Sequence, residues 1–488
     1  MSFTFLTRPA VVAGAMALAA AVSTSGRDAQ RPAPISIGVE YVLIDKADKV
    51  GPYARELAQT GVTAAKHYAE HVEWNEMQKS AAAPIDFSRL DSFVREFQAA
   101  GFADVVICLR SRSRWASKKY TLLGNQNISP KPEHLEAYGQ WIGAIVERYD
   151  ADGRGDMPGL RRPVVWYEIG SELSTYEAEP VPEYLVMLER AYASAHAAFA
   201  GVKIAHAAFL TTNAFRDHPG PAGYERAFAS VDKRIMYHGL PAIRAVLDRG
   251  DLFDVVNIHS LGDPAELEDM VAWLNWEMNR RRWTKPIIVS DTAATPFIAW
   301  GNAVTCTGLK AFLGLMVAPA TERDRCRLAA YFTKLVASDP ATIEWTHQFL
   351  ADDLIKRVVI AADQGIVLIN TAFVEDLHLL KMKAMNAGAG TSAWSGMIDL
   401  VKRERRPAFT ALKNVTEWLK DYDAIRRVSM PDSEVRVYEV RKGGGVSWIG
   451  WLHPSRVWLP EDEQPSRDVV LPGGRTVRLM TTPTRIGA

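Results

Sequence analysis

Two carboxyl residues each end an apolar stretch of the sequence, and this placement points to chemistry. Glu172 closes the stretch that begins at Val164, and Asp291 closes the stretch that begins at Lys285. The segment between them has room for about three strand–helix units. If both stretches are parallel strands, both carboxyls lie at the edge where the strands end. Paired carboxyls across a cleft can cleave a glycosidic bond, since one protonates the leaving oxygen and the other attacks the anomeric carbon or activates water.

The elements that must position these carboxyls alternate along the chain. Apolar runs predict strands, and amphipathic stretches between them predict helices. This alternation predicts a parallel (β/α)8 barrel over residues 31–425. A doubly wound open sheet is the alternative, but it favours a Gly-rich phosphate turn after the first strand, and none is present. The strands are predicted over 35–43, 63–68, 104–109, 162–169, 203–209, 253–259, 286–289 and 365–371, and the helices over 53–59, 86–100, 134–149, 184–199, 240–247, 265–282, 323–337 and 351–363.

The sequence changes character near residue 425. Residues 434–441 alternate between polar and apolar side chains, Lys442 and three glycines follow, and residues 446–451 alternate again. This pattern predicts a β-hairpin. We therefore expect a small antiparallel β domain over residues 426–488.

The two carboxyl segments resemble motifs of a known family. Tyr167-Glu-Ile-Gly-Ser-Glu172 is similar to the strand-4 motif of clan-A glycoside hydrolases, aromatic-Glu-Val-x-Asn-Glu, whose last Glu is the acid/base. Lys285-Pro-Ile-Ile-Val-Ser-Asp291 is similar to their strand-7 motif, which ends in the nucleophilic Glu. The resemblance spans roughly residues 35–480 and is greatest to the β-xylosidases and α-iduronidase-like proteins of family 39. Further similar segments are Trp74 with Ile85–Asp91, Phe253–His259, and Lys402–Leu412, which resembles the closing helix of the barrel.

The resemblance implies a glycosidase that needs no cofactor and no metal. It assigns the general acid/base to Glu172 and the nucleophile, or base, to Asp291. The substrate is then an oligosaccharide or polysaccharide. The residues that the resemblance and their positions near strand ends suggest for sugar contacts are Ser171, His259, His67, Arg110, Trp115, Phe373 and its rival Trp394.

Two departures from the family motifs fall on the site itself. Ser171 stands where the family has an Asn that contacts the sugar 2-hydroxyl, and serine is shorter with one donor instead of two. Asp291 stands where the family has Glu, so its carboxyl retreats by ~1.5 Å. Retaining enzymes hold their carboxyls ~5–5.5 Å apart and inverting enzymes ~6.5–9.5 Å, so this change is expected to place the pair between the classes. One alternative is therefore a catalytically impaired barrel that binds polysaccharide or serves in assembly, and another is a barrel with unrelated chemistry.

Composition and the N-terminal residues bear on partners and compartment. The chain has 57 Lys and Arg residues and 57 Asp and Glu residues, so its formal net charge is zero. Proteins that bind nucleic acid normally carry an excess of basic residues, so this composition does not favour nucleic acid as a partner. Arg8, an uncharged run over residues 9–22 and the small residues 23–26 are typical of an export signal, so residues 1–30 are predicted to be a leader. We expect an exported protein, periplasmic or extracellular, with no stable membrane insertion beyond that leader.

The three cysteines give neither a disulfide framework nor a metal-ligand spacing. Cys108 lies in an apolar strand pattern and is expected to be a buried thiol. Cys306 and Cys326 can pair in an oxidising compartment. The chain also has no G-x-S-x-G elbow, H-E-x-x-H motif or P-loop.

Overall fold

The structure is a computed structural model of the 488-residue chain. It describes residues 34–42, 47–120, 128–173, 179–231, 236–293, 306, 319–372, 374–375, 394, 396–399, 403–453, 455–463, 465–471 and 476–480. No helix within these ranges is both long and apolar enough to cross a membrane.

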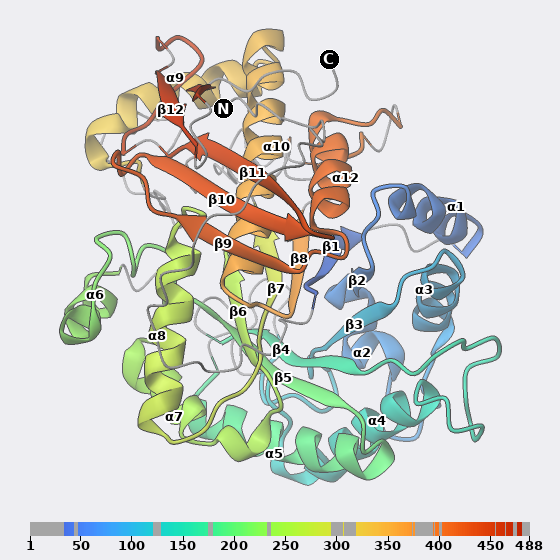
Figure 1. Cartoon of the computed structure of the whole chain (residues 1–488). Helices are drawn as coiled ribbons and strands as arrows, with labels where there is room; N and C mark the ends of the chain where they lie inside the picture. The colour runs from blue at the N-terminus through green and yellow to red at the C-terminus, as the bar shows by residue number, and fades with distance from the viewer. Residues whose placement is uncertain are drawn as a thin grey trace, which may run out of the picture.

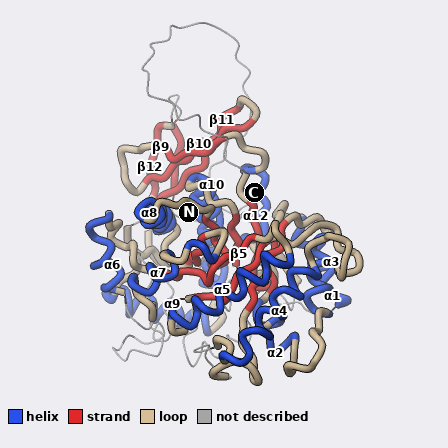
Figure 2. The backbone as a smooth tube through the Cα atoms, turned by 90° about the horizontal axis from the view of Figure 1, so that it is seen from below, coloured by secondary structure: helices blue, strands red, loops and turns tan. Residues whose placement is uncertain are grey.

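The described part of the chain contains a closed barrel of parallel strands, as the sequence predicts (Figure 1). Neighbours in the barrel follow chain order, and β8 closes it by pairing with β1. Figure 2 shows the barrel strands in the centre with helices around them. The strands are β1 Ser36–Val42, β2 Ala64–His67, β3 Asp104–Leu109, β4 Trp166–Glu172, β5 Lys203–Leu210, β6 Val256–Ser260, β7 Ile287–Ala293 and β8 Leu368–Ala372.

The helices carry apolar faces that pack on the outside of the barrel. In α3, for example, Leu90, Phe93, Val94 and Phe97 are buried and recur at helical spacing. The helices are α1 Ala47–Ala58, α2 Trp74–Met77, α3 Ser88–Ala99, α4 Leu135–Arg148, α5 Val181–Ala198, α6 Tyr224–Ser230, α7 Leu240–Leu247, α8 Glu266–Arg280, α9 Arg325–Val336, α10 Pro340–Asp363 and α12 Pro407–Leu419, with short 3-10 turns at Ala69–Val72, Pro132–His134, Pro221–Gly223, Gly250–Leu252 and Glu322–Asp324.

The structure corrects several predicted helix boundaries, and α10 shows the reason most clearly. It begins at Pro340 rather than at residue 351, because Asp339 caps it by accepting a hydrogen bond from the main-chain nitrogen of Thr342 at 2.9 Å. Its first half packs through Trp345 and Phe349 into a second apolar cluster, away from the barrel core. In the same way, α1 begins at Ala47 rather than at residue 53, and α5 begins at Val181 rather than at residue 184. The segment 402–412, which resembles the closing helix of the family, overlaps the first half of α12 at Pro407–Leu419.

A separate antiparallel sheet follows the barrel. It has the order β11-β10-β9, from Ala424–Val428, Val435–Lys442 and Gly445–Leu452, and the pairing of Lys442 with Gly445 confirms the predicted hairpin. Strands β12 (Ser466–Val470) and β13 (Thr476–Met480) form a further hairpin. The sheet is anchored to the barrel at Glu268 of α8, which accepts a hydrogen bond from the hydroxyl of Tyr438 at 2.8 Å.

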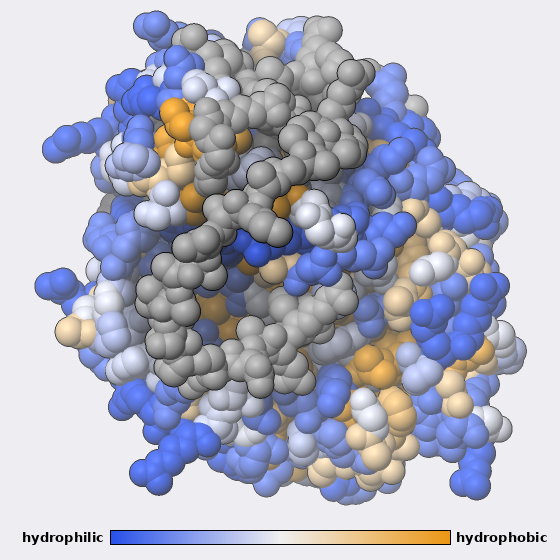
Figure 3. Space-filling view, viewed as in Figure 1, coloured by the Kyte–Doolittle hydropathy of each residue, from blue (hydrophilic) through white to orange (hydrophobic). Residues whose placement is uncertain are grey.

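The described surface carries few large exposed hydrophobic side chains. Hydrophilic residues dominate the face in Figure 3. The large hydrophobic side chains that are about half exposed or more lie on separate elements. They are Val186, Tyr237, Val446 and Val470.

Candidate active site

A one-residue bulge in β4 turns Glu172 into the barrel. Ile169 pairs with His206 and Glu172 pairs with Ala208, so β4 has one residue more than β5 over this stretch. Gly170 lies in the bulge with a φ of 82°, a conformation that glycine adopts without strain. The bulge therefore accounts for the glycine of the sequence motif.

A second bulge, in β7, does the same for Asp291. Val289 pairs with Ile258 of β6, but the next pair is Asp291 with His259, so Ser290 is the extra residue. Side chains of directly paired residues lie on the same face of a sheet. Asp291 therefore shares the inner face with His259, whereas strict alternation would have placed it on the opposite face from Ser290.

The structure brings Glu172, His259 and Asp291 together. One carboxylate oxygen of Glu172, one of Asp291 and a ring nitrogen of His259 all lie within 4.8 Å of one another. Glu172 is 3% exposed and Asp291 is 5% exposed, so the pair is screened from bulk water. The two nearest carboxylate oxygens are therefore closer than the ~5.5–6.5 Å interval between the two mechanistic classes, where the sequence had placed the pair.

His259 lies between several acceptors. Its Nδ1 is 2.7 Å from Glu172 Oε1, and its Nε2 is 3.0 Å from Ser290 Oγ and 3.7 Å from Glu168 Oε1. Burial lowers the pKa of this imidazole, but hydrogen bonds to Glu168 and Glu172 outweigh burial and raise the pKa to about 10. His259 is therefore an imidazolium at neutral pH.

A buried ion-pair network that the sequence analysis missed lies beneath this group. Lys66 Nζ is 2.9 Å from Glu40 Oε1 and 2.9 Å from Glu168 Oε2. It also donates to the main-chain oxygen of Ser290 at 3.3 Å. The sequence does contain a sign of this network, because Glu40, Lys66 and Glu168 each lie inside an apolar strand run. A charged side chain buried in this way requires a partner of opposite charge.

Burial also acts on the remaining carboxyls. It raises the pKa of Asp291, partly opposed by His259 and Lys66, and raises that of Glu40 well above its usual range. Glu168 is the exception, because Lys66 and His259 together outweigh its burial and lower its pKa. The interior of the barrel therefore holds neighbouring carboxyls whose pKa values are shifted in opposite directions.

Two of the predicted sugar-contact residues, His67 and Arg110, are held by other contacts. His67 pairs with Val42 and its ring packs edge-on against Phe93 of α3, on the outer side of β2, where burial and His71 lower its pKa to about 3. The structure thus places Lys66 and not His67 in the barrel interior. Arg110, at the end of β3, is 1% exposed, and its Nη1 lies 3.0 Å from both Glu70 and Glu73.

The other predicted contacts lie at different depths. Ser171 is partly buried in β4, directly before Glu172. Trp115 stacks edge-on against Trp74, with ring centroids 4.8 Å apart, and donates from Nε1 to the main-chain oxygen of Gln78 at 3.0 Å. Trp394 is 4% exposed and belongs to the apolar cluster of α9 and α10, and Phe373 lies outside the described residues.

The atoms of Glu172, His259 and Asp291 are close enough to share a cation. Both nitrogens of His259 already face other side chains, Glu172 and Ser290, so a cation would have to displace these contacts. A second group with metal-ligand spacing precedes β4, at the opposite end of the barrel, and consists of Glu147, Asp150 and Asp152.

No protein-family model matches the chain, and no curated protein matches it by sequence. Solved structures do match its fold. A β-xylosidase from Caulobacter crescentus CB15 aligns over 90% of this chain and 80% of its own, with a TM-score of 0.50 and 12% identity. The GH39 enzyme from Xanthomonas axonopodis pv. citri aligns over 90% and 78%, with a TM-score of 0.51 and 10% identity.

A glucosidase from Croceicoccus marinus is similar to the same extent, with a TM-score of 0.50 and 12% identity over 85% of this chain and 76% of its own. Identities this low establish likeness of fold. The chain therefore has the (β/α)8 barrel fold of these glycoside hydrolases, including that of family 39.

Proposed function

We propose that the protein hydrolyses O-glycosidic bonds of a saccharide, with Glu172 and Asp291 as the two working carboxyls. The observation that carries the proposal is their separation, since one oxygen of each lies within 4.8 Å of the other at the ends of β4 and β7. This distance is nearer to the ~5–5.5 Å between the carboxyls of retaining enzymes than to the ~6.5–9.5 Å of inverting enzymes, which must admit a water between them. We therefore propose that the anomeric configuration is retained.

The site also has the surroundings that such chemistry needs. Both carboxyls are almost fully buried, so charge that develops in the transition state is stabilised by fixed groups rather than by water. The fold similarity to a β-xylosidase and a glucosidase supports a saccharide substrate.

The test is hydrolysis of a panel of aryl glycosides by the wild type, Glu172→Gln and Asp291→Asn. Glu266→Gln is the matched control, because Glu266 is 3% exposed, lies at the start of α8 and has a pKa that burial raises to about 8. We expect the wild type and the control to release aryl alcohol and both site variants to lose that activity. Activity that survives in both site variants would exclude this pair.

A wild type that releases no alcohol but still binds oligosaccharide would instead identify a carbohydrate-binding barrel. Ser171 and Asp291, which replace the Asn and Glu of the family motifs, are the residues that favour this second function. Isothermal titration with the same sugars distinguishes the two.

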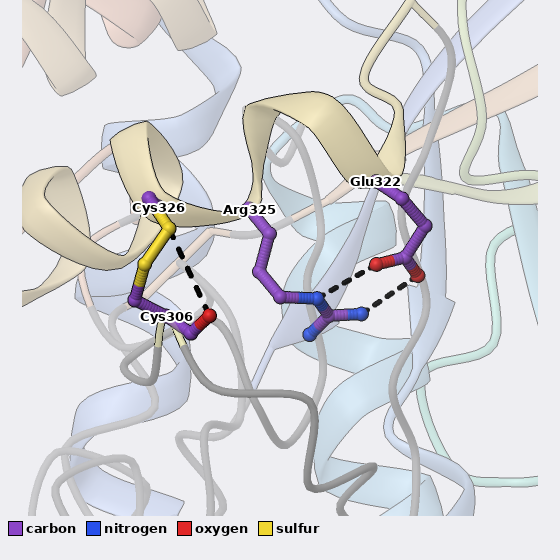
Figure 4. Close-up of a disulfide and its surroundings, with 4 residues drawn as sticks. All are labelled: Cys306, Glu322, Arg325 and Cys326. Atoms are coloured by element: carbon purple, nitrogen blue, oxygen red, sulfur yellow. Dashed lines mark hydrogen bonds and ion pairs between the residues drawn. A yellow bond between two sulfur atoms is a disulfide. The ribbon is translucent and has the colours of Figure 1, made fainter.

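We also propose that the protein is exported through its N-terminal leader. The disulfide between Cys306 and Cys326 supports this, because such bonds persist in oxidising compartments (Figure 4). Cell fractionation and N-terminal sequencing of the mature protein test it. A full-length chain confined to the cytoplasm would contradict export.

A further inference from the structure

The extra residue of the β7 bulge, Ser290, lies entirely inside the barrel, where it is 0% exposed. It is extra relative to both neighbouring strands, since the pairs Val289–Ile369 and Thr292–Thr371 also enclose one residue more in β7 than in β8. The extra residue of a bulge drops out of the ladder of the sheet. Its main-chain groups are then out of reach of water and need other partners, because an unpaired buried carbonyl is destabilising.

Two side chains from other strands donate to the main-chain oxygen of Ser290. Lys66 of β2 donates from Nζ at 3.3 Å, and Asn370 of β8 donates from Nδ2 at 3.4 Å. The hydroxyl oxygen of Ser290 lies 3.0 Å from Nε2 of His259 in β6. Side chains from three strands therefore hold the bulge residue from inside the barrel.

Asn370 is fitted to this contact at a cost to the fold. It pairs with Gly38 of β1, and a Cβ on that glycine would lie 2.2 Å from Asn370 Oδ1, so the glycine leaves the space that the amide occupies. Oδ1 of Asn370 is buried and has no hydrogen-bond partner in the part of the chain that the structure describes. A half-satisfied buried amide destabilises a barrel interior, so its presence needs a reason. The bond from Nδ2 to Ser290 supplies that reason.

The bulge determines where the carboxyl of Asp291 points. In a regular strand, Ser290 and Asp291 would face opposite sides of the sheet. In the bulged strand, Asp291 pairs with His259 and shares the inner face with it. Loss of the bulge would turn one of these two β7 side chains out of the interior, and the Asp291 carboxyl would no longer meet Glu172. Whatever fixes Ser290 therefore also fixes Asp291.

We infer that Asn370 and Lys66 are positioning residues for Asp291, and that they act through the main-chain oxygen of Ser290. The inference rests on the proposed glycosidase function and concerns the residues that hold one of its two carboxyls in place. Lys66 also forms ion pairs with two carboxylates, so its replacement changes charge as well as geometry. Asn370 is neutral, and its replacement isolates the positioning effect.

The test measures kcat and KM of Asn370→Leu on an aryl glycoside that the wild type cleaves. Leucine has the branched outline of asparagine but no donor, so β7 is free to shift while the interior stays filled. A displacement of ~1 Å can cost ~10²-fold in rate, and we expect kcat to fall by that order. KM should stay near the wild-type value, because Asn370 lies beside the bulge and not beyond the strand ends.

Asn257→Leu is the matched control. Asn257 is 0% exposed in β6, and its Nδ2 donates to the main-chain oxygen of His206 at 3.2 Å, away from the bulge. The control should keep the wild-type kcat at a temperature at which circular dichroism shows both variants folded. A wild-type kcat in Asn370→Leu, or the same loss of kcat in both variants, would overturn the inference. Asn370→Ser is the second variant if leucine prevents folding, because serine is smaller but too short to reach Ser290.

Crystal structures of the wild type and both variants test the positioning without any activity. We expect the Asp291 carboxyl to be displaced in Asn370→Leu and unmoved in Asn257→Leu. An unmoved Asp291 in Asn370→Leu would overturn the inference even if the protein is a glycosidase. A wild type that cleaves no glycoside, together with a displaced Asp291 in Asn370→Leu, would instead contradict the proposed function and support the hold of Asn370 on the bulge.

Discussion

Arg357 of α10 donates from Nη1 to the main-chain oxygen of Ser260, 2.8 Å away. The same oxygen accepts a hydrogen bond from Oγ1 of Thr292 at 2.7 Å. Ser260 and Thr292 are the residues that follow His259 and Asp291, so one guanidinium fixes the ends of β6 and β7 where the site lies. Its Nε is paired with Asp353 at 2.5 Å, one turn earlier in α10. Arg357 is therefore a positioning residue for the two groups.

Replacing Arg357 by Met should lower the free energy of unfolding by about 3–5 kcal/mol, because Asp353 is left buried without its partner. Arg357→Lys keeps the charge but not the forked geometry, and should lose less stability. Urea denaturation measures both. Arg325→Met is the control, since Arg325 pairs with the exposed Glu322 at 2.7 Å (Figure 4) and should cost at most about 1 kcal/mol. Equal losses at the two positions would contradict the positioning role.

Lys66→Met should destabilise the barrel in a manner that depends on pH. Without Lys66, the pKa of Glu168 is expected to rise above its unfolded value of ~4.3, so the folded state binds the extra proton. The free energy of unfolding of Lys66→Met should therefore fall as pH rises above the unfolded-state pKa of Glu168. The loss near neutral pH should be about 3–5 kcal/mol, as for other broken buried pairs.

Denaturation midpoints of Lys66→Met in acid and at neutral pH provide the measurement. Lys79→Met is the control, because Lys79 pairs with Glu76 at the surface, where its side chain is 63% exposed. A variant that is equally stable in acid and at neutral pH would show that Lys66 does not balance these carboxyls.

The barrel and its carboxyl pair were predictable from the sequence, but the network beneath them was not. Apolar runs revealed the strands and Glu172 and Asp291 at their ends. The orientation of β2 was not encoded in this way, because Lys66 and His67 are adjacent polar residues in a strand of four residues, and either could face inward. The barrel selects Lys66, since only the inner face offers Glu40 and Glu168 as partners.

The bulge in β7 was equally hidden. In a regular strand, Ser290 and Asp291 point to opposite faces, and no glycine marks the extra residue. Pairing with His259 of β6 places Asp291 on the inner face, and the contact of Ser290 Oγ with His259 Nε2 places Ser290 there as well. The motif therefore indicated which residue to examine, while the strand register determined where its carboxyl lies.

Removing the disulfide should lower stability by about 3 kcal/mol, since it closes a loop of moderate length. Cys306 and Cys326 are separated by 20 residues. The double variant Cys306→Ser/Cys326→Ser should melt at a lower temperature than the oxidised wild type. Dithiothreitol should lower the melting temperature of the wild type and leave that of the double variant unchanged. An equal response of both proteins would exclude this pairing.

The charge on His259 should make stability depend on pH on the alkaline side. Burial opposes the charge, but Glu168 and Glu172 raise the pKa of His259 to about 10. The unfolded value is ~6.5, so this stabilisation is complete below about pH 6.5 and is lost as pH rises towards 10. The wild type should lose on the order of a few kcal/mol over that range, and His259→Asn should lack this decline.

Imidazole NMR resonances, assigned by comparison with His259→Asn, test the charge directly. Burial lowers the pKa of His67 to about 3 and that of His206 to about 4, so these two rings serve as internal controls. Near pH 8, the His259 ring should show the shifts of an imidazolium while His67 and His206 remain neutral. A neutral His259 at that pH would mean that Glu168 and Glu172 do not stabilise a positive charge on this ring.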